Sequence, residues 1–212
     1  MLLKNLIKNI SKNKGRKIVS GLATDSRKVK KNFIFFAIKG NKSNGENFIK
    51  NAITNGASVI VCSKNYQTKH KNALIIKVSN VRNNLSKIAS KFYLDKPKNI
   101  IAVTGTNGKT SVADLFYQLL RINKIPAASI GTLGIKFNDK VLKTNLTSPN
   151  AIDIHKYLNF LKKKKIENVI IEASSHGLDQ KRLHNINFKA GIFTNFSQDH
   201  LDYHRTMNSY LK

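Results

Sequence analysis

A phosphate-binding loop is the clearest chemical signal in this sequence of 212 residues. The segment 100–110 reads Ile-Ile-Ala-Val-Thr-Gly-Thr-Asn-Gly-Lys-Thr, an apolar run, then a glycine-containing loop, then a helical pattern. That order turns backbone N–H groups and a helix N-terminus toward an anion. Lys109 would reach the β- and γ-phosphates, and the hydroxyl of Thr110 would bind Mg²⁺. Because position 103 is valine where the strict motif has glycine, the pattern indicates a variant loop whose first glycine is Gly105.

A carboxylate at the end of a second apolar run is the next candidate. The segment 169–177 reads Val-Ile-Ile-Glu-Ala-Ser-Ser-His-Gly, so Glu172 closes a predicted strand. In open α/β sheets the carboxyl ends of the strands form the edge at which ligands bind. Opposite a phosphate loop, Glu172 would bind Mg²⁺, a hard cation that prefers oxygen ligands. The alternative is a strand-end glutamate that faces only water, and the neighbouring loop favours the metal.

A third strand-like run, 190–194, leads into Asn-Phe-Ser-Gln-Asp-His-Leu-Asp-Tyr-His at 195–204. Two histidines and two aspartates within six positions suggest zinc, but zinc takes a closed set of His or Cys ligands and no cysteine is near. We therefore expect His200 to contact a second Mg²⁺ or a phosphate, with the nearby carboxylates orienting it. The alternative is a polar loop with incidental histidines.

The first half of the chain alternates strand-like and helical patterns. Its predicted strands are 17–22, 33–38, 57–62 and 73–78, and its predicted helices are 47–55 and 80–93. Residues 1–10 have leucines and isoleucines on one helical face and lysines opposite. We expect this helix to dock on its own domain rather than act as a transit peptide or membrane-surface helix. Lys96-Pro97-Lys98 interrupts the pattern and marks a predicted domain boundary.

The second half predicts a parallel α/β architecture, because strand and helix patterns again alternate. The predicted strands are 99–103, 127–130, 168–172 and 190–194, and the predicted helices are 110–122, 151–163 and 207–212. A long loop with glycine and asparagine runs to Asn150. The sequence stops inside the last predicted helix, and we expect a truncated chain.

Composition excludes two classes of protein. The single Cys62 cannot form an internal disulfide, and no apolar run approaches the length of a membrane span, so a disulfide-stapled secreted domain and a membrane-inserted protein are excluded. The net charge of +27 is consistent with nucleic-acid binding. However, the basic residues are 32 lysines and 6 arginines, and a nucleic-acid-binding protein would favour arginine. We therefore attribute the charge to compositional drift and expect no nucleic-acid partner.

Taken together, the motifs resemble those of the Mur ligases, specifically the UDP-N-acetylmuramoyl-tripeptide synthetases, or MurE type. The matching segments are Thr104-Gly-Thr-Asn-Gly-Lys-Thr110, Glu172-Ala-Ser-Ser-His-Gly-Leu178, Asn195-Phe-Ser-Gln-Asp-His-Leu-Asp-Tyr-His204, Asp25-Ser26-Arg27, Phe33–Ile38, Gly40–Gly45 and Gly56-Ala57. The second of these segments separates the MurE type from its sister ligases and from folylpolyglutamate synthetases.

The resemblance implies an α/β fold with two domains. Residues 1–97 would be a small N-terminal α/β domain that binds the UDP end of the substrate. Residues 98–212 would begin a P-loop-type parallel-sheet ATPase domain. The implied cytoplasmic enzyme uses ATP and Mg²⁺ to phosphorylate the D-glutamyl carboxylate of UDP-MurNAc-L-Ala-D-Glu, and the amine of a diamino acid then attacks the acyl phosphate. The diamino acid, meso-diaminopimelate or lysine, and the oligomeric state stay open.

The resemblance also implies roles for individual residues. Its ATP-binding residues are Gly105, Thr106, Asn107, Gly108, Lys109, Thr110 and Ser111. Its catalytic residues are Lys109, Glu172 and His200, and its Mg²⁺ ligands are Thr110, Glu172 and His200. Its substrate contacts are Ser26 for the uridine diphosphate and Thr147, Ser148, Ser174, Gln180 and Arg182 for the muramoyl-dipeptide. Arg182 is chemically suited, because a guanidinium matches a carboxylate bidentately; the alternative is a surface arginine.

Two departures from the family limit these expectations. Asn44-Gly45-Glu46 replaces the family's Asp-Gly-His/Arg-like run, so we assign no uridine contact there. The family's carbamylated lysine and its carboxy-terminal domain fall beyond Lys212, so we expect this chain to bind the UDP-substrate but to turn over poorly or not at all. The competing hypotheses are a sister ligase of the folylpolyglutamate synthetase type and a basic nucleic-acid-binding module whose affinity falls steeply with salt.

Overall fold

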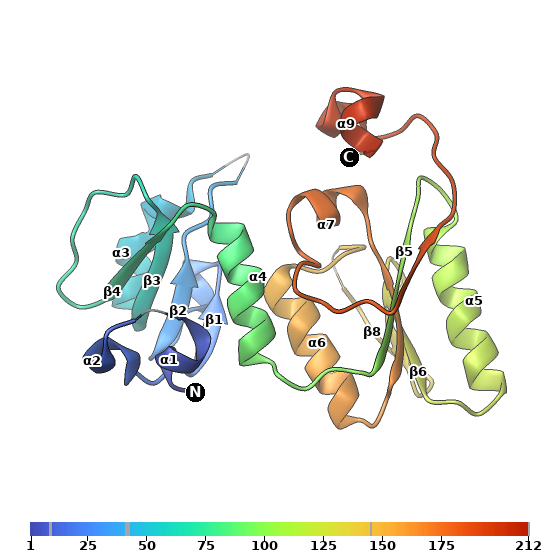
Figure 1. Cartoon of the computed structure of the whole chain (residues 1–212), viewed down its shortest axis with the longest axis horizontal. Helices are drawn as coiled ribbons and strands as arrows, with labels where there is room; N and C mark the ends of the chain where they lie inside the picture. Colours follow the sequence, from blue (N-terminus) through green and yellow to red (C-terminus); the bar gives the residue numbers. More distant parts are fainter. Residues whose placement is uncertain (9, 41–42, 145, 212) are drawn as a thin grey trace. The chain divides into compact units, whose positions relative to one another are not determined.

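The computed structural model describes residues 1–8, 10–40, 43–144 and 146–211, and it divides the chain into two compact units (Figure 1). Unit 1 is Met1–Phe92 and unit 2 is Tyr93–Lys212. The predicted boundary after residue 97 lies close to this division. Each unit has its own sheet and is described separately. No helix in the described ranges has both the length and the apolar character needed to cross a membrane.

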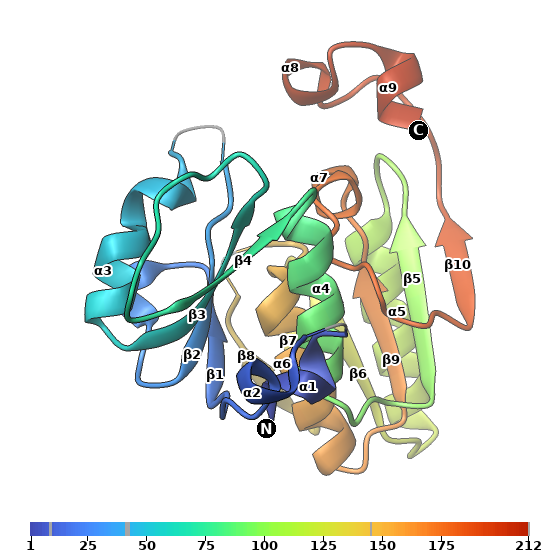
Figure 2. The ribbon, with the colours of Figure 1, turned by 60° about the vertical axis from the view of Figure 1, so that its left-hand side comes forward.

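Unit 1 contains a four-stranded parallel sheet. Its strands are β1 (Gly21–Ala23), β2 (Phe33–Phe36), β3 (Ala57–Ser63) and β4 (Leu74–Val78), in the order β1-β2-β3-β4. Its main helices are α3 (Ile49–Thr54), extended at its start by a 3₁₀ turn, η2 (Gly45–Phe48), and α4 (Val81–Phe92). Figure 2 shows α3 on one face of the sheet and α4 on the other. Phe35 and Ile60 are fully buried between the sheet and α3 because successive strand residues alternate between its faces.

The N-terminal segment differs from its prediction. The predicted helix over 1–10 is a single turn, α1 (Leu3–Leu6), and a second short turn, α2 (Lys12–Gly15), follows it. Extended pairing competes with the helix: Leu2 forms an antiparallel bridge with Ile18, and the Met1 amino group donates to the Val19 carbonyl at 2.9 Å. In place of the predicted strand 17–22 the structure has this bridge at Ile18 and the three-residue β1, which ends one residue later. Leu3 and Leu6 are buried in unit 1, as expected for a docked segment.

Unit 2 is built on a six-stranded mixed sheet. Its strands are β5 (Asn99–Thr104), β6 (Ala127–Gly131), β7 (Gly134–Phe137), β8 (Lys140–Leu142), β9 (Asn168–Glu172) and β10 (Ala190–Phe193). The order is β10-β5-β9-β6-β7-β8; the first four are parallel, and β7 and β8 are antiparallel additions. The carboxyl ends of β10, β5 and β9 therefore lie together at one edge.

Two helices cover opposite faces of this sheet (Figure 1). α5 (Lys109–Ile122) packs on Val103 and Ile170, whereas α6 (Ala151–Lys163) packs on Ile100 and Ile171. The predictions of α6 and β9 are confirmed residue for residue. Three short helices complete the unit: α7 (Ser175–Asp179), α8 (Leu201–His204) and α9 (Met207–Leu211).

The hairpin β7–β8 corrects the predicted long loop to Asn150. Its turn residues Asn138 and Asp139 have φ of 43° and 59°, the left-handed conformations of a two-residue type I′ hairpin turn. All three residues of β8, Lys140, Val141 and Leu142, are exposed. Their sequence shows no alternation of apolar and polar residues that would predict a strand.

Candidate functional site

A cavity of about 450 Å³ lies at the carboxyl edge of β5 and β9 in unit 2. Most of the predicted site residues line it. They are Gly105, Thr106, Asn107, Gly108, Lys109, Thr110, Ser111, Thr147, Ser148, Glu172, Ser174, Arg182 and His200, accompanied by Thr132, Leu146, Ser175, His176 and Tyr210. The three motifs that are far apart in the sequence therefore meet in one cavity.

The phosphate loop runs from the end of β5 to the start of α5. Gly105 has φ of +135° and Gly108 has φ of +84°, both conformations that side chains disfavour. A Cβ on Gly105 would stand 2.0 Å from the Thr194 hydroxyl, so glycine is required there by contact as well as by conformation. Gly108 is the N-cap of α5 and has no side chain to accept from the first amides of that helix, whose residues line the cavity.

Lys109 folds over this loop. Its ammonium group donates to the carbonyls of Gly105 at 2.6 Å and Thr106 at 2.8 Å. Burial lowers the pKa of Lys109, and the carboxylates of Glu172 and Asp199 act against that shift. The amine therefore lies against the loop, in the position expected of a phosphate-binding lysine.

Glu172 is a buried carboxylate, with 2% of its surface exposed. It accepts hydrogen bonds from the Thr110 hydroxyl at 2.8 Å, from the Thr132 N–H at 3.0 Å and from the Thr132 hydroxyl at 3.1 Å. Gly131 makes room for it, because a Cβ there would stand 1.9 Å from Glu172 Oε1. The donors offset the cost of burying a carboxylate, and the missing side chain of Gly131 leaves the space for it.

The donor set around Glu172 fits Mg²⁺. The carboxylate and the Thr110 hydroxyl are hard oxygen ligands on neighbouring elements, 2.8 Å apart. In the described part of the chain no group of three or more His, Cys, Asp or Glu side chains is arranged to hold a metal. Mg²⁺ typically binds through one or two carboxylates plus substrate phosphates and water rather than a full protein cage. A zinc site would need such a group of His, Cys, Asp or Glu ligands, and the described residues contain none.

Ser148 and Ser174 form the wall beside Glu172. The Ser148 hydroxyl donates to the Glu172 carbonyl at 2.8 Å and lies 3.0 Å from the Ser174 hydroxyl, which accepts from the Gly177 N–H. Arg182 closes this wall, because its Nη1 donates to the Ser148 carbonyl at 2.8 Å and its Nε and Nη2 to the Gln180 side chain. Arg182 is therefore fixed at the cavity rather than extended into solvent.

His200 belongs to a cluster of rings. Its main chain has φ of +53°, and its main-chain N–H donates to the Asp199 carboxylate at 2.7 Å. Its ring lies edge-on to His176, with centroids 5.0 Å apart, and His204 is 5.6 Å from His176. Burial lowers the pKa of His176, and positive charge on His200 and His204 would lower it further. Of the three histidines, His176 and His200 line the cavity.

Two predicted residues lie outside the cavity lining. Gln180 contacts the cavity wall indirectly. Its side-chain oxygen accepts from Arg182, and its side-chain amide donates to the Tyr203 hydroxyl at 3.2 Å. Ser26 belongs to unit 1, where it is buried at the start of the 3₁₀ turn η1 (Ser26–Lys28), which is capped by Asp25.

Sequence reasoning missed Thr132 and Gly131. Gly131 ends β6 and Thr132 follows it, and the carboxyl end of β6 reaches the same edge as that of β9 because the two strands are parallel neighbours. A glycine followed by a hydroxyl residue at the end of a predicted strand was the available signal.

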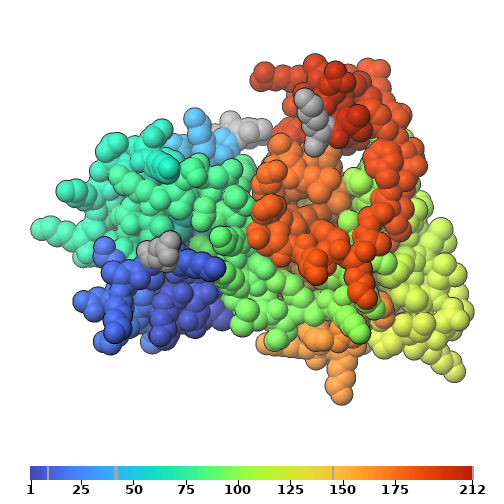
Figure 3. All heavy atoms as spheres, in the orientation of Figure 1, coloured from blue at the N-terminus to red at the C-terminus, as the bar shows by residue number. Residues whose placement is uncertain are grey.

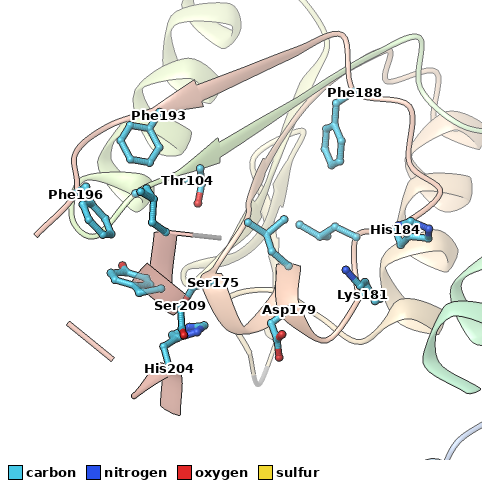
Figure 4. Close-up of a pocket in the computed structure, with 15 residues that line it drawn as sticks. Thr104, Ser175, Asp179, Lys181, His184, Phe188, Phe193, Phe196, His204 and Ser209 are labelled. Carbon is cyan, nitrogen blue, oxygen red and sulfur yellow. The ribbon is translucent and has the colours of Figure 1, made fainter. Parts of the chain in front are cut away.

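A second, more apolar hollow of about 560 Å³ lies between β10, α7 and α9. Figure 4 shows Phe193 and Phe196 on one side of it and Phe188 and Lys181 on the other. In Figure 3 the red atoms that follow β10 lie at the surface beside the orange atoms of α7. This hollow contains few of the residues to which the sequence assigned chemistry.

Comparison with known proteins identifies both units. The family model described as the Mur ligase middle domain matches residues 103–212, and that of the Mur ligase family, catalytic domain, matches residues 18–93. Proteins named UDP-N-acetylmuramoyl-L-alanyl-D-glutamate--2,6-diaminopimelate ligase are similar to the chain. The one from Zymomonas mobilis is 46% identical over 91% of the chain and 39% of its own length. The one from Fusobacterium nucleatum is 43% identical with the same coverage.

The structure comparison agrees with these matches. A solved structure of a protein with that name has a TM-score of 0.83 at 29% identity, and covers 99% of this chain and 43% of its own. A MurF ligase from Thermotoga maritima in complex with ADP has a TM-score of 0.60 at 22% identity, covering 90% and 40%, and shows the shared fold. The chain thus spans about two fifths of the length of the relatives it matches.

Proposed function

The chain belongs to the Mur ligase family, and from this premise we propose that it carries the UDP-substrate-binding and ATP-binding parts of a MurE-type ligase. The reaction is ATP-dependent amide formation on UDP-MurNAc-L-Ala-D-Glu. The proposed amino acid is 2,6-diaminopimelate, because the relatives above bear that name. The proposed location is the cytoplasm, where both nucleotides are available.

One contact carries the proposal. The Thr110 hydroxyl of the phosphate loop donates to the buried Glu172 carboxylate at 2.8 Å, which joins the first turn of α5 to the end of β9. Thr110 and Glu172 would hold Mg²⁺ at this point. When bound, the ion neutralises phosphate charge during phosphoryl transfer. The transfer itself needs positioning and charge stabilisation more than covalent help from the protein.

The remaining residues have separate proposed roles. The amides at the start of α5 receive phosphate oxygens, and Lys109 moves its ammonium group from the loop carbonyls to those oxygens. His200, which lines the cavity, contacts the phosphate or a second Mg²⁺ in this proposal. Arg182 presents its guanidinium to a carboxylate of the muramoyl-dipeptide, with Ser148 and Ser174 beside it. Thr147, whose hydroxyl lies 3.1 Å from the Thr132 hydroxyl, and Gln180 are the further proposed dipeptide contacts.

Unit 1 contributes the uridine diphosphate site in this proposal. Ser26 is the proposed contact, and the neighbouring Asn55 side chain donates to its carbonyl at 2.9 Å, which holds the turn in place. Burial of Ser26 within the unit keeps its backbone ordered for a ligand at the turn.

Binding by the 212-residue chain is the direct test, because the chain is shorter than its relatives. We expect calorimetric titration to detect saturable 1:1 binding of UDP-MurNAc-L-Ala-D-Glu and of Mg·ADP. Lys109→Met should weaken Mg·ADP about tenfold or more and leave the muramoyl nucleotide unaffected. Lys156→Met on the exposed face of α6 is the matched control and should change neither affinity.

The same titration distinguishes the competing hypotheses. A folate substrate that binds where the muramoyl nucleotide does not would favour a folylpolyglutamate synthetase. Tight binding of duplex DNA that falls steeply with salt, together with no muramoyl-nucleotide binding, would make the charge of +27 the function instead.

A further inference from the structure

The segment after β10 runs beside the phosphate loop and extends the β5–β10 pairing past the end of both strands. The Thr194 N–H donates to the Thr104 carbonyl at 2.9 Å, and the Thr106 N–H donates to the Asn195 carbonyl at 2.9 Å. The Ser197 N–H then donates to the Thr106 hydroxyl at 3.0 Å. The third motif of the sequence is therefore a partner of the first one, in addition to bearing His200.

Asn195 makes the most specific of these contacts. Its side-chain Oδ1 accepts from the Asn107 N–H at 3.0 Å, and its Nδ2 donates to the Asn107 carbonyl at 3.1 Å. One amide side chain thus satisfies both polar main-chain groups of a single loop residue. The Thr194 hydroxyl donates to the same Asn107 carbonyl at 2.6 Å.

The position of Asn107 makes these contacts consequential. It lies between Gly105 and Gly108, both at positive φ, and glycines give a loop conformational freedom that must be lost when a ligand binds. Fixing the Asn107 main chain fixes the turn between the two glycines. The turn then enters α5, whose first amides have no partner within the helix and are available to an anion.

We propose that Asn195 is a positioning residue that clamps the Asn107 main chain and so holds the phosphate loop in the shape that receives a nucleotide. The proposal rests on the proposed function, since it takes nucleotide phosphate as the ligand of the loop. Asn195 contacts the loop and is not among the residues that line the cavity, so its substitution acts through the conformation of the loop.

Asn195→Ala removes both side-chain contacts and keeps the backbone carbonyl that accepts from Thr106. In the full chain we expect it to weaken Mg·ADP binding about tenfold by calorimetry, the effect of losing two hydrogen bonds. We expect hydrogen exchange at the Asn107 amide to accelerate at least tenfold, while exchange at the Thr106 amide and in β9 stays unchanged. Asn187→Ala, at an exposed asparagine that precedes β10, is the matched control.

Thr194→Val provides a second variant of nearly equal volume. It removes the hydroxyl that donates to the Asn107 carbonyl and also lies 3.2 Å from the Thr104 carbonyl, and it keeps the Asn195 side chain. We expect a loss of Mg·ADP affinity of about threefold. Because valine fits a strand end, this variant keeps the test valid if Asn195→Ala fails to fold.

Each outcome decides the proposal. Unchanged Mg·ADP affinity in Asn195→Ala, or faster exchange throughout unit 2 with a lower melting temperature, overturns it and leaves Asn195 a residue of general stability. If the wild-type chain does not bind Mg·ADP, the proposed function fails and the role in nucleotide binding fails with it. In that case exchange at Asn107 still reports whether the clamp exists.

Discussion

The sheets of unit 1 and unit 2 both contain buried parallel strands, such as β3 and β9, and the two units differ in the polar residues that they bury. In unit 1 the buried polar residues among those described are the two serines Ser26 and Ser86. In unit 2 they include Thr106, Ser148, His155 and Glu172, and all of these except His155 line the cavity.

The difference shows what a charged site requires of a sheet. Glu172 ends a strand in which the three preceding residues are fully buried, and Thr110 and Thr132 donate hydrogen bonds to its carboxylate. Gly131 gives up a side chain to admit it. In β2 of unit 1, by contrast, Phe35 and Phe36 fill the interior without any polar partner. In unit 1 the strand interior is therefore filled by apolar packing, whereas in unit 2 hydrogen-bond donors and a glycine accommodate a buried carboxylate at the edge of the sheet.

The largest expected effect tests packing in unit 1. Phe35→Ala removes a fully buried ring and should lower the free energy of unfolding of unit 1 by about 4 kcal/mol. Hydrogen exchange in β2 and β3 measures it, and exchange in β9 serves as the internal reference. Equal acceleration in both sheets would mean that the units do not unfold separately and would break the comparison.

Acid should act on unit 2 through His155. Burial, with the nearby Lys96 charge, lowers the pKa of His155 to about 4 from 6.5. The folded form stays neutral between these values while the unfolded form takes up a proton, so stability is complete above pH 6.5 and falls as the pH drops toward 4. The loss at pH 4 is about 3 kcal/mol.

The control for this prediction is His155→Gln, which cannot titrate. Chemical denaturation followed by circular dichroism at pH 7, 5.5 and 4.5 should give a shallower pH dependence in this variant than in the wild type. Parallel curves for the two proteins would contradict the assignment to His155.

Thr132 sharpens the comparison at the edge of the sheet. Thr132→Val removes the hydroxyl that donates to Glu172 and keeps the backbone donor. Because the acceptor is a buried carboxylate, we expect unit 2 to lose about 2 kcal/mol. Thr132→Ser retains the hydroxyl and should restore most of it, measured by urea denaturation. A serine variant as unstable as valine would point to the methyl group instead.

The smallest expected effect concerns a surface pair. Arg121 and Asp139 form an ion pair in which both side chains are more than half exposed. Arg121→Ala should change the free energy of unfolding by about 0.5 kcal/mol or less, because water screens the pair. A melting temperature more than a few degrees lower would show that unit 2 depends on its surface charges as well as on its buried ones.

Local patterns were sufficient to predict the elements that carry the site. The period of α6, the apolar run of β9 and the order strand, glycine loop, helix at 99–122 are all encoded within short windows. The parallel alternation then implied a common edge for Glu172 and the loop. The positions of both are confirmed, whereas the roles of the site residues stay predictions.

Other features depend on contacts between distant segments and could not be predicted from a window. α1 is short because Leu2 pairs with Ile18, and β8 exists because a type I′ turn at Asn138 returns the chain to β7. Thr132 becomes a partner of Glu172 only when β6 lies beside β9. In each case a partner remote in sequence determines the local structure.

The position of β10 at the end of the unit 2 sheet has a consequence for handling the protein. All four of its residues are exposed, including Ile192 and Phe193, and its outer side offers main-chain groups to another strand. At low ionic strength the charge of +27 keeps molecules apart. Added salt screens that repulsion, so we expect concentrated samples in high salt to self-associate through this edge and dilute samples in low salt to stay dispersed.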